Sequence, residues 1–205
     1  MTNNDPIPAG SLLLTDIGAE VAGYSADVTR TYPQSGRFRP EQRAIYEAVL
    51  RAQNETIALM KPGAHMRDLH ETAIKILGED LLRLGLVSRN EREQVRMYFP
   101  HGLGHDLGLR VHDVNDRTQP LAPGRIVTSE PGIYVRAVDV RAHSAYLALP
   151  EAERAGVDAA LAKYADIGVR IEDDILVTTG APQNLSAGAP RTVAEIEAWM
   201  AGDTP

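Results

Sequence analysis

Five oxygen- and nitrogen-bearing side chains, spread over most of the chain, sit in short segments that suit the binding of two metal ions. They lie in LLLTDIGAEVAGYSADVTRTYP, FPHGLGHDLGLRVHD, IVTSEPGIYV and GVRIEDDILV, and they are Asp16, Asp27, His105, Glu130 and Glu172. Four carboxylates and one imidazole favour hard or borderline divalent ions such as Mn²⁺ over ions that prefer thiolates. Two such ions held a few Å apart can share a water, lower its pKa and direct it at a carbonyl, which is hydrolytic chemistry.

The first two carboxylates, Asp16 and Asp27, are eleven residues apart, too far for one helix face. On adjacent strands they can face each other with Cβ atoms roughly 5 Å apart. Carboxylates that close repel each other unless a cation lies between them. The alternative, in which Asp16 caps a turn and Asp27 is a solvated strand residue, stays open for this fragment alone.

Three histidines follow within twelve residues, in HGLGHDLGLRVHD, and they are His101, His105 and His112. The glycines between them suit a backbone that packs closely while imidazoles point into a cavity. A structural alternative is that one or two of these rings are buried and bond only to carbonyl groups. Three histidines so close together favour a binding site.

The remaining two carboxylates are predicted at strand positions. Glu130 precedes Pro131 and Gly132, which end an apolar strand, and a carboxylate buried there is costly without a cation or donors. Alternation along the strand puts Arg170, Glu172 and Asp174 on one face. The alternative for this last segment is an exposed acidic strand edge.

Composition narrows the class of protein. With 205 residues and 43% hydrophobic content, the chain suits one domain or one and a half. A net charge of −7 argues against nucleic-acid binding, and no apolar run is long enough for a membrane span. The first ten residues lack the pattern of a secretory signal, and zero cysteines exclude a disulfide framework and a Cys-based zinc site. We expect a soluble, cytoplasmic protein.

The order of expected elements indicates an α+β domain. A strand meander covers 11–32, and helical spacing of Ile45, Val49, Ala52 and Leu59 predicts a helix after Pro40. A second helix over 66–84 buries one side and stops at Gly85; that side holds Leu69, Ala73, Ile76, Leu77 and Leu81. A short helical turn is expected within 88–96, and strands are expected at 126–129, 133–135 and 169–177. We also expect a surface helix inside the 136–166 insertion and a closing helix over AEIEAWM.

Taken together, the motifs resemble the catalytic domain of the pita-bread metallopeptidases, in the Xaa-Pro aminopeptidase and prolidase branch. The resemblance runs nearly from end to end, through DIGAEVAGYSADVTRTYP, FRPEQRAIYEAVL, FPHGLGHDLGLRVHDV, LAPGRIVTSEPGIYV, GVRIEDDILVT and EIEAWM. It implies hydrolysis of the peptide bond that precedes proline. It also implies two divalent ions, Mn²⁺ first, with Co²⁺, Zn²⁺ and Fe²⁺ as alternatives.

The resemblance implies a role for each site residue. Asp16 would chelate one ion, Asp27 and Glu172 would bridge both, and His105 and Glu130 would complete the shell of the other. Glu130 would also carry a proton. His112 would hydrogen-bond the reacting carbonyl, and His101 would line the pocket for the proline. Arg170 and Tyr134 would orient the ligands, as metal carboxylates generally require.

The chain also departs from the family's pattern. We expect the first half of the catalytic domain to be reduced to residues 1–32 and the second half to comprise residues 33–205. Within the first part, TNND resembles the tail of a substrate-site segment. An incomplete sheet would expose an edge and an apolar patch, which invites a homo-oligomer or the preceding segment as partner.

Two differences lie beside the ligands: Asp106 replaces an aromatic residue and Arg110 an acidic one. They form either a compensating pair or a pocket of altered polarity.

Two further functions are possible alternatives to the peptidase. One is a non-catalytic binding module, or inactive fragment, on the same scaffold, and the other is hydrolysis of a small amidine or amide.

Overall fold

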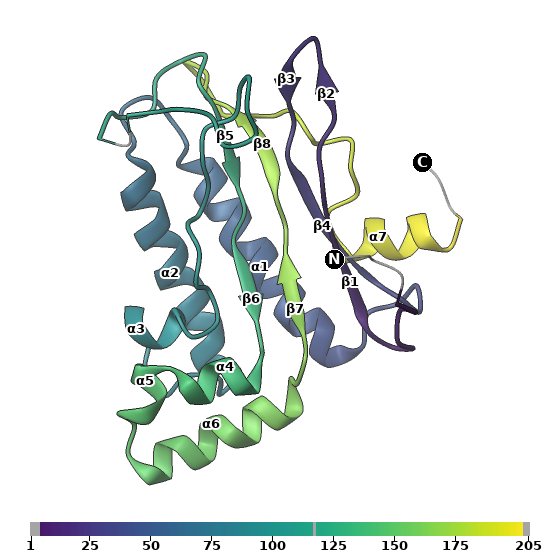
Figure 1. Cartoon of the computed structure of the whole chain (residues 1–205), viewed down its shortest axis with the longest axis vertical. Coiled ribbons are helices and arrows are strands. Elements are labelled where there is room, and N and C mark those ends of the chain that lie inside the picture. Colours follow the sequence, from purple (N-terminus) through teal and green to yellow (C-terminus); the bar gives the residue numbers. More distant parts are fainter. Residues whose placement is uncertain (1–4, 117, 203–205) are drawn as a thin grey trace.

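Antiparallel strand pairs form the framework of the computed structural model, which describes residues 5–116 and 118–202 (Figure 1). The first part holds two pairs, β1 (Leu12–Ile17) with β4 (Val28–Pro33) and β2 (Glu20–Val21) with β3 (Tyr24–Ser25). The second part holds β5 (Ile126–Ser129) with β8 (Asp173–Leu176), β8 with β9 (Gln183–Asn184), and β6 (Gly132–Tyr134) with β7 (Gly168–Arg170). The first four residues of the predicted 1–32 remnant, which include most of the TNND tail, lie outside the described residues, and the proposed division at 32 stays a prediction.

The strand predicted over 169–177 is wrong as one element, because it is divided into β7 and β8. Its partner strand is divided at the same level, between β5 and β6. Ser129 pairs with Asp173, and the β6–β7 pair continues the same register beyond the gap. Glu130 and Glu172 therefore face each other where both strands are interrupted. This opposition places two carboxylates side by side in the middle of the sheet.

Two long helices cover one face of the strands, and their faces follow the predicted periodicity. They are α1 (Pro40–Ala58) and α2 (Met66–Arg83). Proline suits the first turn of α1, and Gly85, with a φ of 77°, follows the end of α2. Leu59 was counted in the apolar spacing of the predicted helix but lies outside it. It follows the last residue of α1 and is 48% exposed, whereas its neighbour Met60 is buried.

The 136–166 insertion forms three helices rather than one, at the lower end of the molecule in Figure 1. They are α4 (Ala137–Ala142), α5 (Ser144–Leu147) and α6 (Glu151–Lys163). The predicted turn near 88–96 is α3 (Arg92–Val95), and the closing helix is α7 (Val193–Met200). The α+β class is confirmed, with helices α1 and α2 ahead of the strands that flank Glu130 and Glu172.

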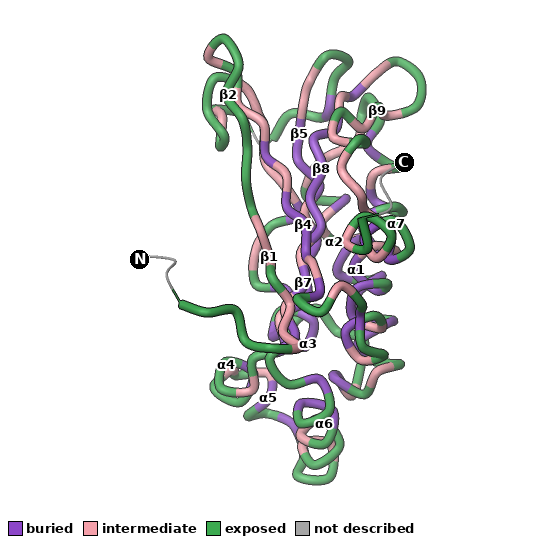
Figure 2. The backbone as a smooth tube through the Cα atoms, turned by 90° about the vertical axis from the view of Figure 1, so that its right-hand side faces the viewer, coloured by how far each residue is buried: buried purple, intermediate pink, exposed green. Residues whose placement is uncertain are grey.

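Burial differs between the two parts of the framework (Figure 2). Strands β5 and β8 and the inward face of α1 are buried, and side chains such as Val49, Val127 and Ile175 have no exposed surface. Strands β1 and β2 are largely exposed. The rigid centre of the sheet therefore lies at β5–β8. None of the helices within 5–116 and 118–202 combines the length and apolar content needed to cross a membrane.

Candidate metal centre

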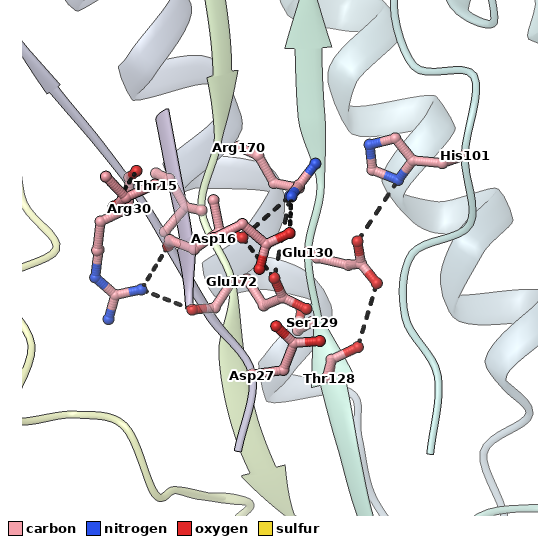
Figure 3. A network of polar contacts seen from close by, with 12 residues as sticks. Thr15, Asp16, Asp27, Arg30, His101, Thr128, Ser129, Glu130, Arg170 and Glu172 are labelled. Carbon is pink, nitrogen blue, oxygen red and sulfur yellow. Dashed lines mark hydrogen bonds and ion pairs between the residues drawn. The ribbon is translucent and has the colours of Figure 1, made fainter. Parts of the chain in front are cut away.

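Candidate ligand side chains meet in three groups, one of which joins Asp27 and His105 to His112. The other two groups consist of the five predicted ligands, and Figure 3 shows their four carboxylates. Asp16, Asp27 and Glu172 form one group, and His105, Glu130 and Glu172 form the other. Within each group the candidate ligand atoms lie within 4.8 Å of one another. Glu172 belongs to both groups and lies between them. Such an arrangement can hold two cations that share one carboxylate.

Strands β1 and β4 bring the two aspartates together, although not in the expected way. Asp16 faces Thr29 across the strand pair, and Asp27 precedes β4 by one residue. The expected direct opposition of Asp16 and Asp27 is therefore wrong, and the two are diagonal neighbours, which still allows contact. Gly18 permits this close passage, because a Cβ atom there would lie 1.7 Å from the carbonyl oxygen of Ala26.

His105 reaches the site because its segment, 103–107, runs antiparallel beside β5. Thr128 donates its backbone N–H to the His105 carbonyl oxygen at 2.9 Å, and Glu130 donates its own to Leu103 at 2.8 Å. A Cβ atom at Gly104 would lie 2.1 Å from the carbonyl oxygen of Thr128, so only glycine fits there. The glycine-rich sequence thus has the steric role that its composition predicted.

The imidazole of His105 points one nitrogen at the acidic groups. Its Nε2 atom lies 3.4 Å from Asp27, 3.5 Å from Glu130 and 3.9 Å from Glu172. The other nitrogen, Nδ1, lies 3.1 Å from the backbone carbonyl oxygen of Asp106. In the neutral ring the proton therefore belongs on Nδ1, where it can be donated, and the lone pair of Nε2 faces the carboxylates. This is the geometry of a histidine ready to bind a cation.

Electrostatics indicates that the acidic cluster is suited to positive charge. Burial raises the pKa of Glu172 to about 8, and repulsion from Glu130 adds to the rise. Burial also raises the pKa of Glu130 to about 7. The pKa of Asp27 is raised to about 6 by burial and by Asp16. The ionised form of each of these three carboxyl groups is disfavoured by its surroundings. A divalent cation between the groups would favour the ionised forms. The donor set therefore fits the predicted metal pair.

Arg170 contacts two of the candidate ligands, Asp16 and Glu172, whereas Tyr134 is connected to them only through Arg170. The guanidinium of Arg170 forms an ion pair with Asp16 and donates to the Tyr134 hydroxyl oxygen at 3.1 Å. Its Nε donates to the Thr29 hydroxyl oxygen, also at 3.1 Å. Tyr134 continues the chain, because its hydroxyl lies 2.8 Å from Nε2 of His101. These bonds link one metal-facing carboxylate to the histidine at the cavity wall.

Two side chains that the sequence did not single out as orienting groups also hold the ligands in place. The Thr29 hydroxyl donates to Oε2 of Glu172 at 2.6 Å. Asp174 accepts the backbone N–H of Asp27, with its two oxygens at 3.3 and 3.2 Å. The predicted strand alternation already placed Asp174 on the face of Glu172. Thr29 had no comparable signal, because its partner lies 143 positions away.

The remaining two histidines line a cavity of about 900 Å³ next to the acidic cluster. His112 is exposed, and its ring lies 4.2 Å from that of His105, edge to face. His101 is less exposed; its ring centroid lies 4.8 Å from that of Phe99 and 5.5 Å from that of Tyr134. Burial lowers the pKa of His101. Both rings stand where a molecule bound in the cavity would meet them. Their predicted contacts with a substrate stay predictions.

Of the two alternatives for Asp106 and Arg110, the compensating pair is wrong. Arg110 is exposed, whereas Asp106 is buried and bonds to Arg125 through both carboxylate oxygens. Asn115 also donates to Asp106. The charge of Asp106 is thus satisfied by a residue nineteen positions away rather than four. This bidentate pair ties the beginning of the loop that carries His112 to the start of β5.

Residues 1–179 match the model of metallopeptidase family M24. Among curated proteins, the chain is 44% identical to Xaa-Pro aminopeptidase 2 of Streptomyces coelicolor, over 98% of this chain and 42% of that protein. It is 37% identical to human Xaa-Pro aminopeptidase 3, over 95% of this chain and 36% of that protein. The chain therefore spans less than half the length of these curated relatives.

A solved structure shares the same fold. The aminopeptidase PepP of Pseudomonas aeruginosa superimposes with a TM-score of 0.82 at 38% identity, over 98% of this chain and 44% of that one. The zinc-substituted aminopeptidase P of Escherichia coli in complex with product gives a TM-score of 0.82 at 34% identity, over 100% of this chain and 44% of that one. The likeness covers every described strand and helix that supplies the site.

Proposed function

Because this chain belongs to metallopeptidase family M24, we propose that it carries the dinuclear centre of a peptidase that cleaves the bond preceding proline. The pita-bread fold expected from the motifs is confirmed by the likeness to aminopeptidase P. Relatives named Xaa-Pro aminopeptidase support the substrate class. The observation that carries the proposal is the pair of ligand groups that share Glu172.

The proposed ligands divide as their positions suggest. Asp16, Asp27 and Glu172 hold one ion, and His105, Glu130 and Glu172 hold the other, with Asp27 also within reach of the second group. When bound, a pair of divalent ions at such a site lowers the pKa of a water and polarises a carbonyl. We propose that both ions are Mn²⁺, because a set of oxygen donors with one imidazole suits this ion.

Other side chains of the chain would handle the substrate and the proton. Glu130 lies between Thr128, which donates to its Oε1, and His101, whose ring lies 3.8 Å from its Oε2. It is therefore placed to receive a proton and to return it. His112, at the cavity entrance, would donate a hydrogen bond to the reacting carbonyl oxygen. His101 would pack against the proline ring with Leu103.

The alternative is a non-catalytic binding module on the same scaffold. The complete set of five donors favours the enzyme, since a module without catalysis has no need to keep carboxylates that repel one another. A binding module would still take up proline peptides or metal ions. The two functions therefore differ in turnover rather than in binding.

The test is cleavage of a tripeptide with proline second, compared with the same peptide carrying alanine there. We expect Mn²⁺-dependent release of the first residue from the proline peptide alone. Glu172→Gln and His105→Ala should lower the rate at least about 100-fold, because loss of outer partners alone costs about 10- to 100-fold. The exposed helical control Glu47→Gln should leave it unchanged.

Each outcome has a distinct meaning. Full activity in Glu172→Gln or His105→Ala would show that the proposed ligands are wrong. A chain that binds Mn²⁺ and cleaves neither peptide would favour the binding module. Comparison with an Xaa-Pro dipeptide separates aminopeptidase from dipeptidase activity, since only the former needs the peptide to continue beyond proline.

A further inference from the structure

A buried guanidinium lies behind the metal-facing carboxylates, on the other side of strand β4. Arg30 is 2% exposed, and strand alternation turns it away from the face to which Thr29 and Glu172 point. Figure 3 shows its side chain directed away from Asp27 and Glu130. Arg30 therefore cannot touch a metal ion or a peptide in the cavity.

Every donor of this guanidinium is used. Its five N–H groups meet oxygens from three separate segments, and the acceptors belong to Thr29, Glu172, Asp173, Ala189 and Pro190. Two of these bonds are short: 2.6 Å to the backbone carbonyl oxygen of Glu172 and 2.7 Å to the carboxylate of Asp173. Arg30 thus binds Glu172, which lies in the interruption between β7 and β8, and Asp173, the first residue of β8.

The backbone of Glu172 depends on strand β4 for its orientation. It lies in the gap between β7 and β8, outside both ladders. Its N–H donates to the Thr29 carbonyl oxygen at 3.0 Å, and its carbonyl oxygen accepts from Arg30. Repulsion from Glu130, which stands opposite, would push the carboxylate away from the cluster. The two backbone bonds counteract that displacement.

We propose that Arg30 is a positioning residue of the metal centre, which fixes the Glu172 backbone from the opposite face of the sheet. The proposal rests on the dinuclear site proposed above, because Glu172 is the carboxylate common to both ligand groups. A small rotation of this one residue would disturb both metal positions. Loss of Arg30 should therefore weaken metal binding although no ligand is removed.

A purely structural role for Arg30 can be separated from this one, because the chain offers a matched residue. Arg191 contacts the same buried Asp173 at 3.3 Å and also donates to Gln53 at 3.0 Å. It has no bond to Glu172. Removal of Arg191 therefore weakens the same buried network but removes neither of the two hydrogen bonds to the Glu172 backbone.

The experiment compares Arg30→Lys with Arg191→Lys in titrations with Mn²⁺, followed by electron paramagnetic resonance. Lysine keeps the charge but cannot reproduce the planar five-donor geometry. We expect Arg30→Lys to raise the Mn²⁺ dissociation constant about 10-fold or more, as for other outer partners of metal ligands. Arg191→Lys should change the Mn²⁺ dissociation constant by less than about 2-fold relative to the wild-type protein. Circular dichroism confirms that both variants are folded at the titration temperature.

If Arg30→Lys does not fold, Arg30→Gln combined with Asp173→Asn replaces the buried ion pair by a neutral pair, with Asp173→Asn alone as its control. The combined variant should bind Mn²⁺ about 10-fold more weakly than that control. Equal affinity within either comparison would overturn the proposal. Wild-type protein that binds Mn²⁺ without cleaving proline peptides would contradict the proposed function alone. Wild-type protein that binds no divalent ion would contradict both.

Discussion

Glu172 is held at three points, one on its side chain and two on its backbone, by its neighbours on β4. Thr29 bonds to its side chain and to its backbone N–H, and Arg30 bonds to its backbone carbonyl oxygen. Opposite it stands Glu130, with the same charge and with little exposed surface. A residue in this position needs both a cation in front and donors around it. The geometry of the proposed site therefore depends on side chains that are not among its candidate ligands.

At the residue scale, we predict that Thr29→Val weakens Mn²⁺ binding about 10-fold, because it removes the donor to Glu172 and the acceptor of Arg170. Stability should fall by about 1 kcal/mol for the lost hydrogen bonds. Calorimetric titration and urea unfolding measure the two effects. Thr31→Val is the control, since Thr31 bonds only the backbone of Arg170. Equal loss of affinity in both variants would show that Thr29 has no special relation to the site.

At the element scale, the segment 103–107 acts as an additional strand beside β5. It has the hydrogen bonds of an antiparallel pair but too few regular residues to form a long strand, because glycines interrupt it. Its close approach to β5 puts His105 beside Thr128 and Glu130. A small change in the distance between this segment and β5 would move the imidazole away from the carboxylates.

We predict that Gly104→Ala displaces this segment, because its new methyl group would meet the carbonyl oxygen of Thr128 at 2.1 Å. Such overpacking costs about 1–3 kcal/mol, and the Mn²⁺ affinity should fall with it. Gly102→Ala is the matched control, since the nearest atoms there lie 4.0 Å away. Thermal unfolding with and without Mn²⁺ measures both effects. Equal unfolding temperatures in the two variants would contradict the steric argument.

At the scale of the whole molecule, the site joins parts of the chain that lie far apart in sequence. Asp16 on β1 and Asp27 just before β4 are two of the candidate ligands, and Glu130 and Glu172 lie next to β5 and β8. The fifth, His105, comes from the segment 103–107 beside β5. Among the described residues, β1 pairs only with β4, and Leu13 and Ile17 on β1 are exposed. A homo-oligomer or a preceding segment as partner at this edge stays a prediction.

Because metal ions would link these two parts, we predict that Mn²⁺ stabilises the whole fold. At about 100 times the dissociation constant, one bound ion adds about 2.7 kcal/mol. For a domain of this size that raises the midpoint of thermal unfolding by roughly 5–10 °C. Differential scanning calorimetry, with excess chelator as the reference, measures the shift. Glu172→Gln should lose most of it, and a shift that persists in this variant would place the ion elsewhere.

The sequence by itself determined the identity of the candidate ligands, their motifs and most helices. Those features depend on residue type and on local periodicity, which the chain displays directly. The helix faces of α1 and α2 follow from apolar spacing, apart from Leu59. The glycines around His105 indicated a close backbone approach before its partner, β5, was known.

Only the tertiary structure decided how distant segments combine. It interrupted the predicted 169–177 strand at Glu172, set Glu130 opposite it, and gave Asp106 the partner Arg125 in place of Arg110. It also enclosed Arg30 among oxygens from three segments. Strand register and buried ion pairs depend on which surfaces pack together, and residues in separate elements leave no spacing pattern from which to infer that packing.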